Sequence, residues 1–152
     1  MSELKDRLQA ELTAAMRARD ELRLATLRMT LTMLKTEEVS GGEASELDDA
    51  AVLKVIAREA KKRRESAEAF DAGNRPELAE RERLEGAILE EYLPAQLGDE
   101  ELRGLVARAV AEAGATSPQQ MGAVMKLVTP EVAGRAEGGR VAAEVKKQLA
   151  GG

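Results

Sequence analysis

Two arginines stand beside a pair of glycines in the segment GRAEGGRV near the end of the chain. If a helix begins at Gly138, its first amides lack partners within the helix and carry partial positive charge, which attracts anions. Gly138 and Gly139 would leave these amides uncovered, with Arg135 and Arg140 beside them. One interpretation of the segment is therefore a phosphate-binding loop. The other predicted phosphate contacts in this part of the chain are Lys126, Lys146 and Lys147.

The same segment also fits a plain turn between two helices. Glycine adopts positive φ readily, and such a turn requires it. Glu137 favours this alternative, because its carboxylate could cap the following helix and occupy the place of the anion. The local pattern leaves both interpretations open.

A second group of basic residues lies in the middle of the chain, in REAKKRRES. Lys61, Lys62 and Arg64 could attract phosphates to a helix surface. Successive helical residues point in different directions, so the run cannot form a single basic face. Lys61, Arg64 and Glu68 stand three and four residues apart, which also suits ordinary ion pairs within one helix. A nucleic-acid contact and a solvated face both remain possible.

Catalytic chemistry has little support in the residue types. The 152 residues include no histidine and no cysteine, which excludes His-based catalysis, disulfides and Cys-ligated metals. Neighbouring acids such as Glu90 and Glu91 point apart on a helix. We therefore expect no catalytic residue, no metal site and no cofactor.

The composition favours helices. Aromatic residues make up 1% and the hydrophobic set 43%, so the core must consist of Leu, Val, Met and Ala, which prefer helices to strands. No apolar run approaches the ~18 residues of a membrane span, and no signal-peptide core is present. We expect no membrane association and a cytoplasmic location. The formal charge of −5 means that any contact with nucleic acid must use local basic patches.

Helical spacing of apolar residues recurs in seven segments. In the first half, Ser2 and Asp20 are expected to cap helices. Ser45, with Asp48 three residues later, is expected to cap a third helix from about Asp48 to Ala72, and a fourth helix should begin at Pro76 and stop before Pro94. We predict an all-α protein with a four-helix domain over residues 1–94 and a three-helix domain over residues 95–152.

The second half has its own start and stop signals. Asp99 is expected to cap the first helix there, Gly114 to end it, and Ser117 with Gln120 to form a capping box. The last helix should begin near residue 138. Gly122 lies inside a predicted helix, where glycine costs up to ~1 kcal/mol relative to alanine, so we expect a neighbouring helix to approach closely at that point.

Several phrases together carry a family likeness. They are EEYLPAQL, GATSPQQMGAVMK and GRAEGGRV, with ARDELRLATLRM and REAKKRRES nearer the N-terminus. On these the chain is identified as a member of the GatB/YqeY family. One small departure is Glu137, since the family usually has Asp there and a single glycine before the next basic residue. The resemblance implies an all-helical protein, similar to the C-terminal part of the B subunit of the glutamine-dependent aminoacyl-tRNA amidotransferase.

The resemblance also implies a function. In that amidotransferase the tail engages tRNA, and a similar module is attached to some glutaminyl-tRNA synthetases. We therefore expect an accessory RNA-binding module that recognises tRNA by shape and backbone. The alternative is a protein-interaction module that docks onto an amidotransferase or a synthetase. A third possibility, by family association only, is carbon–nitrogen ligase activity with glutamine as the amide donor.

Overall fold

The computed structural model describes residues 2–43, 45–132 and 134–151. Residues 1, 44, 133 and 152, which include both outer ends of the predicted domains, lie outside the described residues. In the described part the regular elements are all helical, which confirms the all-α prediction. They are α1 (Glu3–Ala18), α2 (Glu21–Val39), α3 (Asp49–Ala72), α4 (Pro76–Glu90), α5 (Asp99–Ala113), the short 3₁₀ helix η1 (Pro118–Gln120), α6 (Met121–Val132) and α7 (Gly138–Gly151).

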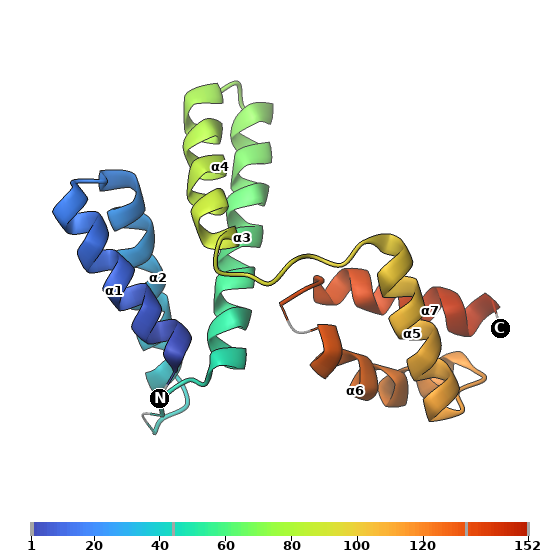
Figure 1. Cartoon of the computed structure of the whole chain (residues 1–152). Helices are drawn as coiled ribbons and strands as arrows, with labels where there is room; N and C mark the ends of the chain where they lie inside the picture. Colours follow the sequence, from blue (N-terminus) through green and yellow to red (C-terminus); the bar gives the residue numbers. More distant parts are fainter. Residues whose placement is uncertain (1, 44, 133, 152) are drawn as a thin grey trace. The chain divides into compact units, whose positions relative to one another are not determined.

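The chain divides into two compact units, each with its own hydrophobic core (Figure 1). The N-terminal unit, Met1–Leu93, contains α1 to α4, and the C-terminal unit, Pro94–Gly152, contains α5 to α7. The stronger statement, that residues 1–94 and 95–152 form separate domains, stays a prediction.

Two helical hairpins make up the N-terminal unit, α1 with α2 and α3 with α4 (Figure 1). α3 starts where expected, but its N-cap is Asp48 and not Ser45. Ser2 and Asp20 cap α1 and α2 as predicted. The side chains of Ser2, Asp20 and Asp48 each accept a hydrogen bond from the backbone N–H three residues further on, at 3.0, 3.2 and 2.9 Å respectively. Pro76 occupies the first turn of α4, also as predicted. The buried core draws on all four helices and includes Leu8, Leu27, Leu34, Val52, Ile56 and Leu89.

Small residues allow α3 and α4 to pack closely. Ala60, Ala67 and Ala79 are buried in this hairpin. A Cβ added to Gly86 of α4 would lie 3.4 Å from the Cβ of Arg63 on α3. This separation is ordinary van der Waals contact at its lower limit, so Gly86 is a position at which two helices approach closely.

Tyr92, near the end of the N-terminal unit, is 5% exposed and is the chain's only tyrosine. Its hydroxyl donates a hydrogen bond to Glu11 Oε1 at 2.8 Å, and the Cζ of Arg7 lies 4.7 Å from the ring centroid. Burial, together with the hydrogen bond to Glu11, raises the pKa of Tyr92 to about 12. Because the chain has no tryptophan, Tyr92 is a spectroscopic reporter for this unit alone.

The C-terminal unit packs α5, α6 and α7 around a valine-rich core. The predicted capping box at Ser117 and Gln120 is present and leads through η1 into α6. Gly114 ends α5 in the left-handed region, at φ 64°, as predicted. Gly98, not Asp99, is the N-cap of α5, and Asp99 is its first helical residue. The buried core side chains include Val106, Val124, Val128, Val141, Val145 and Leu149.

The close approach expected at Gly122 is wrong. A Cβ at this position would meet no atom within 4 Å, so no neighbour requires glycine there. The Gly122→Ala variant is expected to raise the free energy of unfolding by up to ~1 kcal/mol, because alanine restricts the unfolded chain and favours the helix. Thermal unfolding followed by far-UV circular dichroism measures this change.

Gly114→Ala is the matched control in the same unit. The backbone of Gly114 has φ 64°, a conformation that residues with a side chain disfavour. The free energy of unfolding of Gly114→Ala is therefore expected to fall by about 1 kcal/mol or more. Destabilisation by Gly122→Ala equal to that by Gly114→Ala would contradict the open environment of Gly122.

Candidate nucleic-acid interface

The loop that precedes α7 is fixed to the start of α5. The N–H of Leu97 donates to the carbonyl of Arg135 at 2.8 Å. Arg140 Nη1 donates to the carbonyl of Leu97 at 2.7 Å, and Arg140 Nη2 donates to Asp99 Oδ1 at 2.7 Å. Arg140 therefore uses both terminal nitrogens in contacts within the C-terminal unit. These contacts clamp α7 to α5.

The glycines of the same loop have separate roles. Gly134 has φ 74° and makes the turn, whereas Gly138 and Gly139 begin α7 without positive φ. The N–H of Val141 makes the helix's first bond, to the carbonyl of Glu137 at 3.0 Å. A Cβ on Gly138 or Gly139 would meet no atom within 4 Å, so neither positive φ nor a close neighbour explains these two glycines.

Arg135 is held firmly by its backbone and loosely by its side chain. Its N–H donates to the carbonyl of Val132 at 2.7 Å. Its guanidinium reaches the carbonyl of Ala95 only at 3.5 Å and Glu101 Oε2 only at 3.9 Å. The side chain lines an open groove, here called the arginine groove, whose residues are Leu97, Glu101, Gly104, Leu105, Arg108 and Arg135.

Sequence reasoning missed Arg108. Glu101, Gly104, Leu105 and Arg108 follow one another at spacings of three, one and three residues, which places them on one face of α5. The spacing identifies this shared helix face, but only the packing of the loop against the start of α5 brings Arg108 and Arg135 to one groove.

The three predicted lysines of this unit, Lys126, Lys146 and Lys147, are exposed. Within the described part of the chain their ammonium groups take part in no ion pair. Lys147 lines a second open groove, here called the lysine groove, beside Arg103 and Glu144, whose side chains are 3.9 Å apart. These cations are available to a ligand in solvent.

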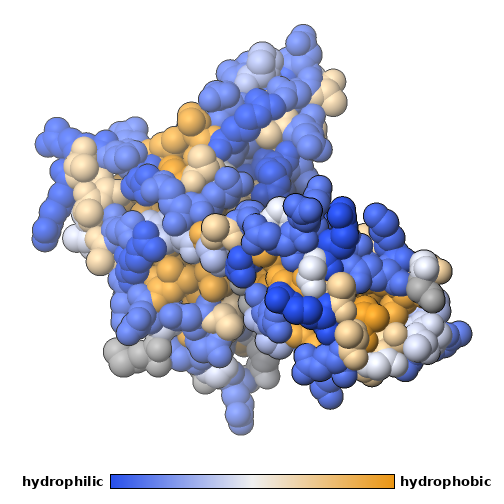
Figure 2. Space-filling view, turned by 45° about the vertical axis from the view of Figure 1, so that its right-hand side comes forward, coloured by the Kyte–Doolittle hydropathy of each residue, from blue (hydrophilic) through white to orange (hydrophobic). Residues whose placement is uncertain are grey.

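The central basic run lies on α3 of the N-terminal unit, and its members have different surroundings. Lys61 is exposed, Lys62 Nζ lies 3.1 Å from Glu59 Oε2, and Arg64 Nη1 lies 3.5 Å from Glu90 Oε1. This ion pair of Arg64 thus crosses to α4 and does not stay within one helix. Figure 2 shows a mostly hydrophilic molecular face with smaller apolar areas, as expected when charged side chains such as these cover helices.

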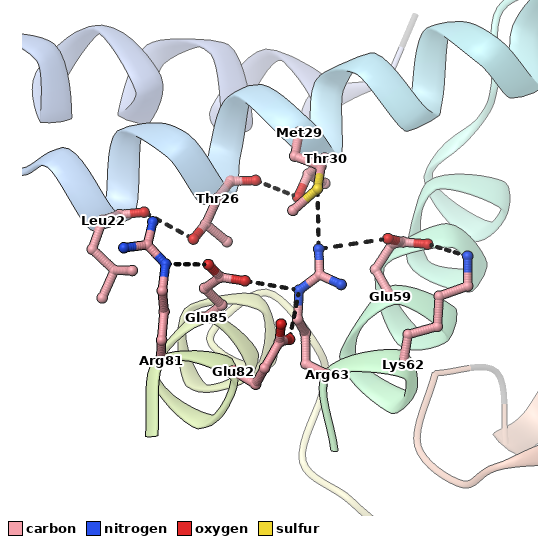
Figure 3. A network of polar contacts seen from close by, with 10 residues as sticks. All are labelled: Leu22, Thr26, Met29, Thr30, Glu59, Lys62, Arg63, Arg81, Glu82 and Glu85. Atoms are coloured by element: carbon pink, nitrogen blue, oxygen red, sulfur yellow. Dashed lines mark hydrogen bonds and ion pairs between the residues drawn. The ribbon is translucent and has the colours of Figure 1, made fainter. Parts of the chain in front are cut away.

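Arg63, from the same run, is only 12% exposed and points between the helices. Its Nε lies 3.0 Å from Glu85 Oε2 and 3.6 Å from Glu82 Oε2, and its Nη2 lies 3.9 Å from Glu59 Oε1. Nη2 also donates to Met29 Sδ at 3.2 Å (Figure 3). We call Arg63 with Glu59, Glu82 and Glu85 the buried charge cluster.

Exposed cations contact the edge of this cluster: Lys62 Nζ lies 3.1 Å from Glu59 Oε2, and Arg81 Nε donates to Glu85 Oε1 at 3.1 Å (Figure 3). On α2, the hydroxyls of Thr26 and Thr30 are buried beside it but donate to backbone carbonyls of their own helix, each at 2.8 Å (Figure 3). Glu59 Oε2, Arg63 Nε and Glu82 Oε2 are buried without a well-aligned hydrogen bond. The cluster therefore depends on proximity of opposite charges, and Arg63 is not accessible to nucleic acid.

Two kinds of feature, metal-ligand groups and membrane-crossing helices, were sought in residues 2–43, 45–132 and 134–151. In these ranges no group of three or more acidic side chains is placed to hold a metal ion. No helix there combines the length and the apolar character needed to cross a bilayer.

The described fold and the exposed cations define a class: a small all-helical protein with a candidate anion-binding surface on its C-terminal unit. A family model for the Yqey-like protein matches residues 5–149. The chain belongs to this family, which confirms the resemblance stated from its motifs.

Curated relatives are fungal proteins named "Altered inheritance of mitochondria protein 41, mitochondrial". The one from Clavispora lusitaniae is 29% identical over 129 residues, 83% of this chain and 74% of the relative. The one from Lachancea thermotolerans is 35% identical over 86 residues, 57% of this chain and 46% of the relative. The one from Kluyveromyces lactis is 34% identical over 88 residues, 58% and 47% respectively. In the last two, the match spans less than half of the relative.

The names of these relatives call them mitochondrial proteins. The expectation of a cytoplasmic location is therefore wrong. The expectation relied on the absence of a membrane-spanning apolar run and of a signal-peptide core. Neither absence distinguishes the cytoplasm from the interior of an organelle, because globular proteins of both compartments fold in water.

Proposed function

We propose that this protein is an accessory RNA-binding module that recognises tRNA through its C-terminal unit. Its main support is that Arg108, Lys126, Lys146 and Lys147 of that unit are exposed and form no ion pair in the described part of the chain. In the same unit Asp99, Glu101 and Glu144 each lie within 4 Å of an arginine, which offsets their repulsion of an anion.

The family contributes the identity of the RNA. The motifs resemble the tail of the amidotransferase B subunit, and tRNA recognition is what this resemblance implies. Phosphate contacts of this kind position an RNA without reading its bases, so the module recognises shape and backbone. Lys61, Lys62 and Arg64 would provide a second contact on the N-terminal unit. No side chain has a chemical role in this proposal.

Binding of labelled tRNA at 50 and 200 mM salt tests the proposal. If the four exposed cations each neutralise one phosphate, the association constant should fall roughly 50- to 150-fold over this range, because each contact releases a counterion. The Lys146→Gln/Lys147→Gln variant should bind tRNA more weakly at low salt. The slope of its log association constant against log salt concentration should be smaller in magnitude by about 2.

Lys35→Gln/Lys54→Gln is the matched control, since it removes the same charge from two exposed lysines outside the predicted contacts. Wild-type protein that fails to bind tRNA at low salt, or binds it with no salt dependence, would overturn the proposal. Equal losses in the two double variants would overturn the assignment to the C-terminal unit.

A further inference from the structure

The arginine groove carries a more specific inference than the general basic surface. It is open to solvent and has an apolar base formed by Leu97 and Leu105. Gly104 has no side chain and so contributes bare backbone to the groove, and open space lies beside it, since a Cβ at this position would meet no atom within 4 Å. An extended ligand can therefore approach α5 more closely here than at any position that carries a side chain.

The two guanidiniums of this groove are free to reorient. Arg108 is exposed and forms no ion pair within residues 2–43, 45–132 and 134–151. The contacts of Arg135, at 3.5 Å to a carbonyl and 3.9 Å to Glu101, are long for charge-assisted hydrogen bonds. Arg140 makes both of its contacts at 2.7 Å and is already committed. Of these three arginines, Arg108 and Arg135 give up the fewest and weakest existing contacts when they turn toward a ligand.

Charge decides what the groove accepts. Two guanidiniums and one carboxylate, Glu101, give it a net charge of about +1, which matches one singly charged phosphodiester. Guanidinium groups pair with phosphate oxygens through two parallel hydrogen bonds. The carboxylate of Glu101 competes for Arg135, so ligand binding must displace this weak ion pair.

We infer that the arginine groove binds one phosphate of an RNA backbone between Arg108 and Arg135, with the adjoining ribose over Gly104 and the apolar base. This inference rests on the proposed function and adds the particular contact. Arg108 and Arg135 are contact residues, Arg140 positions the loop that carries Arg135, and Glu101 restrains binding.

The test compares tRNA affinity among variants at low salt. Arg108→Glu is expected to bind roughly 10-fold or more weakly, with a salt slope reduced by about 1 or more, whereas Arg108→Lys should retain part of the affinity. Arg28→Glu is the control, since it makes the same charge change at an exposed arginine of α2. Glu101→Gln is expected to bind several-fold more tightly, because Arg135 is then released.

The Glu101→Gln variant keeps the inference testable if charge reversal impairs folding, since a gain in affinity requires a folded protein. If wild-type protein binds tRNA but Arg108→Glu behaves like Arg28→Glu, the inference is wrong and the proposed function stands. An unchanged or lower affinity of Glu101→Gln would likewise contradict it. If wild-type protein does not bind tRNA at all, the proposed function itself fails.

Discussion

Replacing Arg63 with methionine is expected to lower the free energy of unfolding of the N-terminal unit by about 3–5 kcal/mol. Methionine fills a similar volume but leaves Glu59, Glu82 and Glu85 without their shared cation. Glu59 and Glu85 are buried, and their carboxylates would then repel each other in a poorly solvated space. Lys62 and Arg81 cannot replace Arg63, because each is exposed and contacts one carboxylate of the cluster.

Urea unfolding followed by Tyr92 fluorescence measures this loss, since Tyr92 reports on the N-terminal unit alone. The control is Arg58→Met, a change on the same helix that removes a 45%-exposed arginine from its ion pair with Glu37. This surface pair is expected to contribute no more than ~1 kcal/mol. Equal losses in the two variants would show that the buried charge cluster is hydrated and contributes no more than a surface pair.

A second large effect is expected at high pH. The pKa of Tyr92 is about 12 in the folded protein and about 10 in an unfolded chain. Below pH 10 the phenol is protonated in both states, so stability does not change through this group. Between pH 10 and 12 the phenol loses its proton only in the unfolded state, and this deprotonation stabilises the unfolded state relative to the folded one. The free energy of unfolding of the N-terminal unit should therefore fall by about 3 kcal/mol as pH rises through this window.

The absorbance of tyrosinate gives the pKa of Tyr92 directly, because the chain has no other tyrosine or tryptophan. Tyr92→Phe is the control for stability, since it leaves the lysines and arginines that also titrate in this range. The difference in unfolding free energy between wild type and variant should change with pH only above pH 10. Titration of native Tyr92 near its ordinary value would contradict the burial and the hydrogen bond to Glu11.

Most helix boundaries were predictable because they depend on local chemistry. Ser2, Asp20 and Asp48 start helices through hydrogen bonds to their own following residues, and Gly114 ends one through its backbone conformation. The predicted cap at Asp99 is wrong by one residue: Gly98 is the N-cap, and Asp99, in the first turn of α5, accepts a hydrogen bond from Arg140.

The direction of a helix face was less predictable than its start. Met16, Met29 and Leu84 fit the apolar spacing, yet they are 48%, 39% and 46% exposed. The small residue Ala15 and the polar residue Thr26 are buried in their regions instead. Spacing fixes the period of a helix face, whereas the neighbouring helix fixes which side is covered, and close packing favours small residues.

In the candidate site, too, local features were predictable and tertiary contacts were not. The loop and its basic residues were recognisable as a motif, but Arg108 belongs to no motif and reaches the groove only through the fold of α5. The engagement of Arg140 was also unpredictable, because its partners Leu97 and Asp99 lie about forty residues earlier in the chain. Residue type predicts what a side chain can bind, and tertiary structure decides whether it is already occupied.

The buried charge cluster has an evolutionary consequence. One guanidinium on α3 serves carboxylates on both α3 and α4, so its contribution depends on several positions at once. Loss of the arginine alone is harmful, whereas simultaneous replacement of the whole group by well-packed apolar residues is close to neutral. Positions 63, 82 and 85 are therefore expected to co-vary across the family, and intermediates that change only position 63 are expected to be rare.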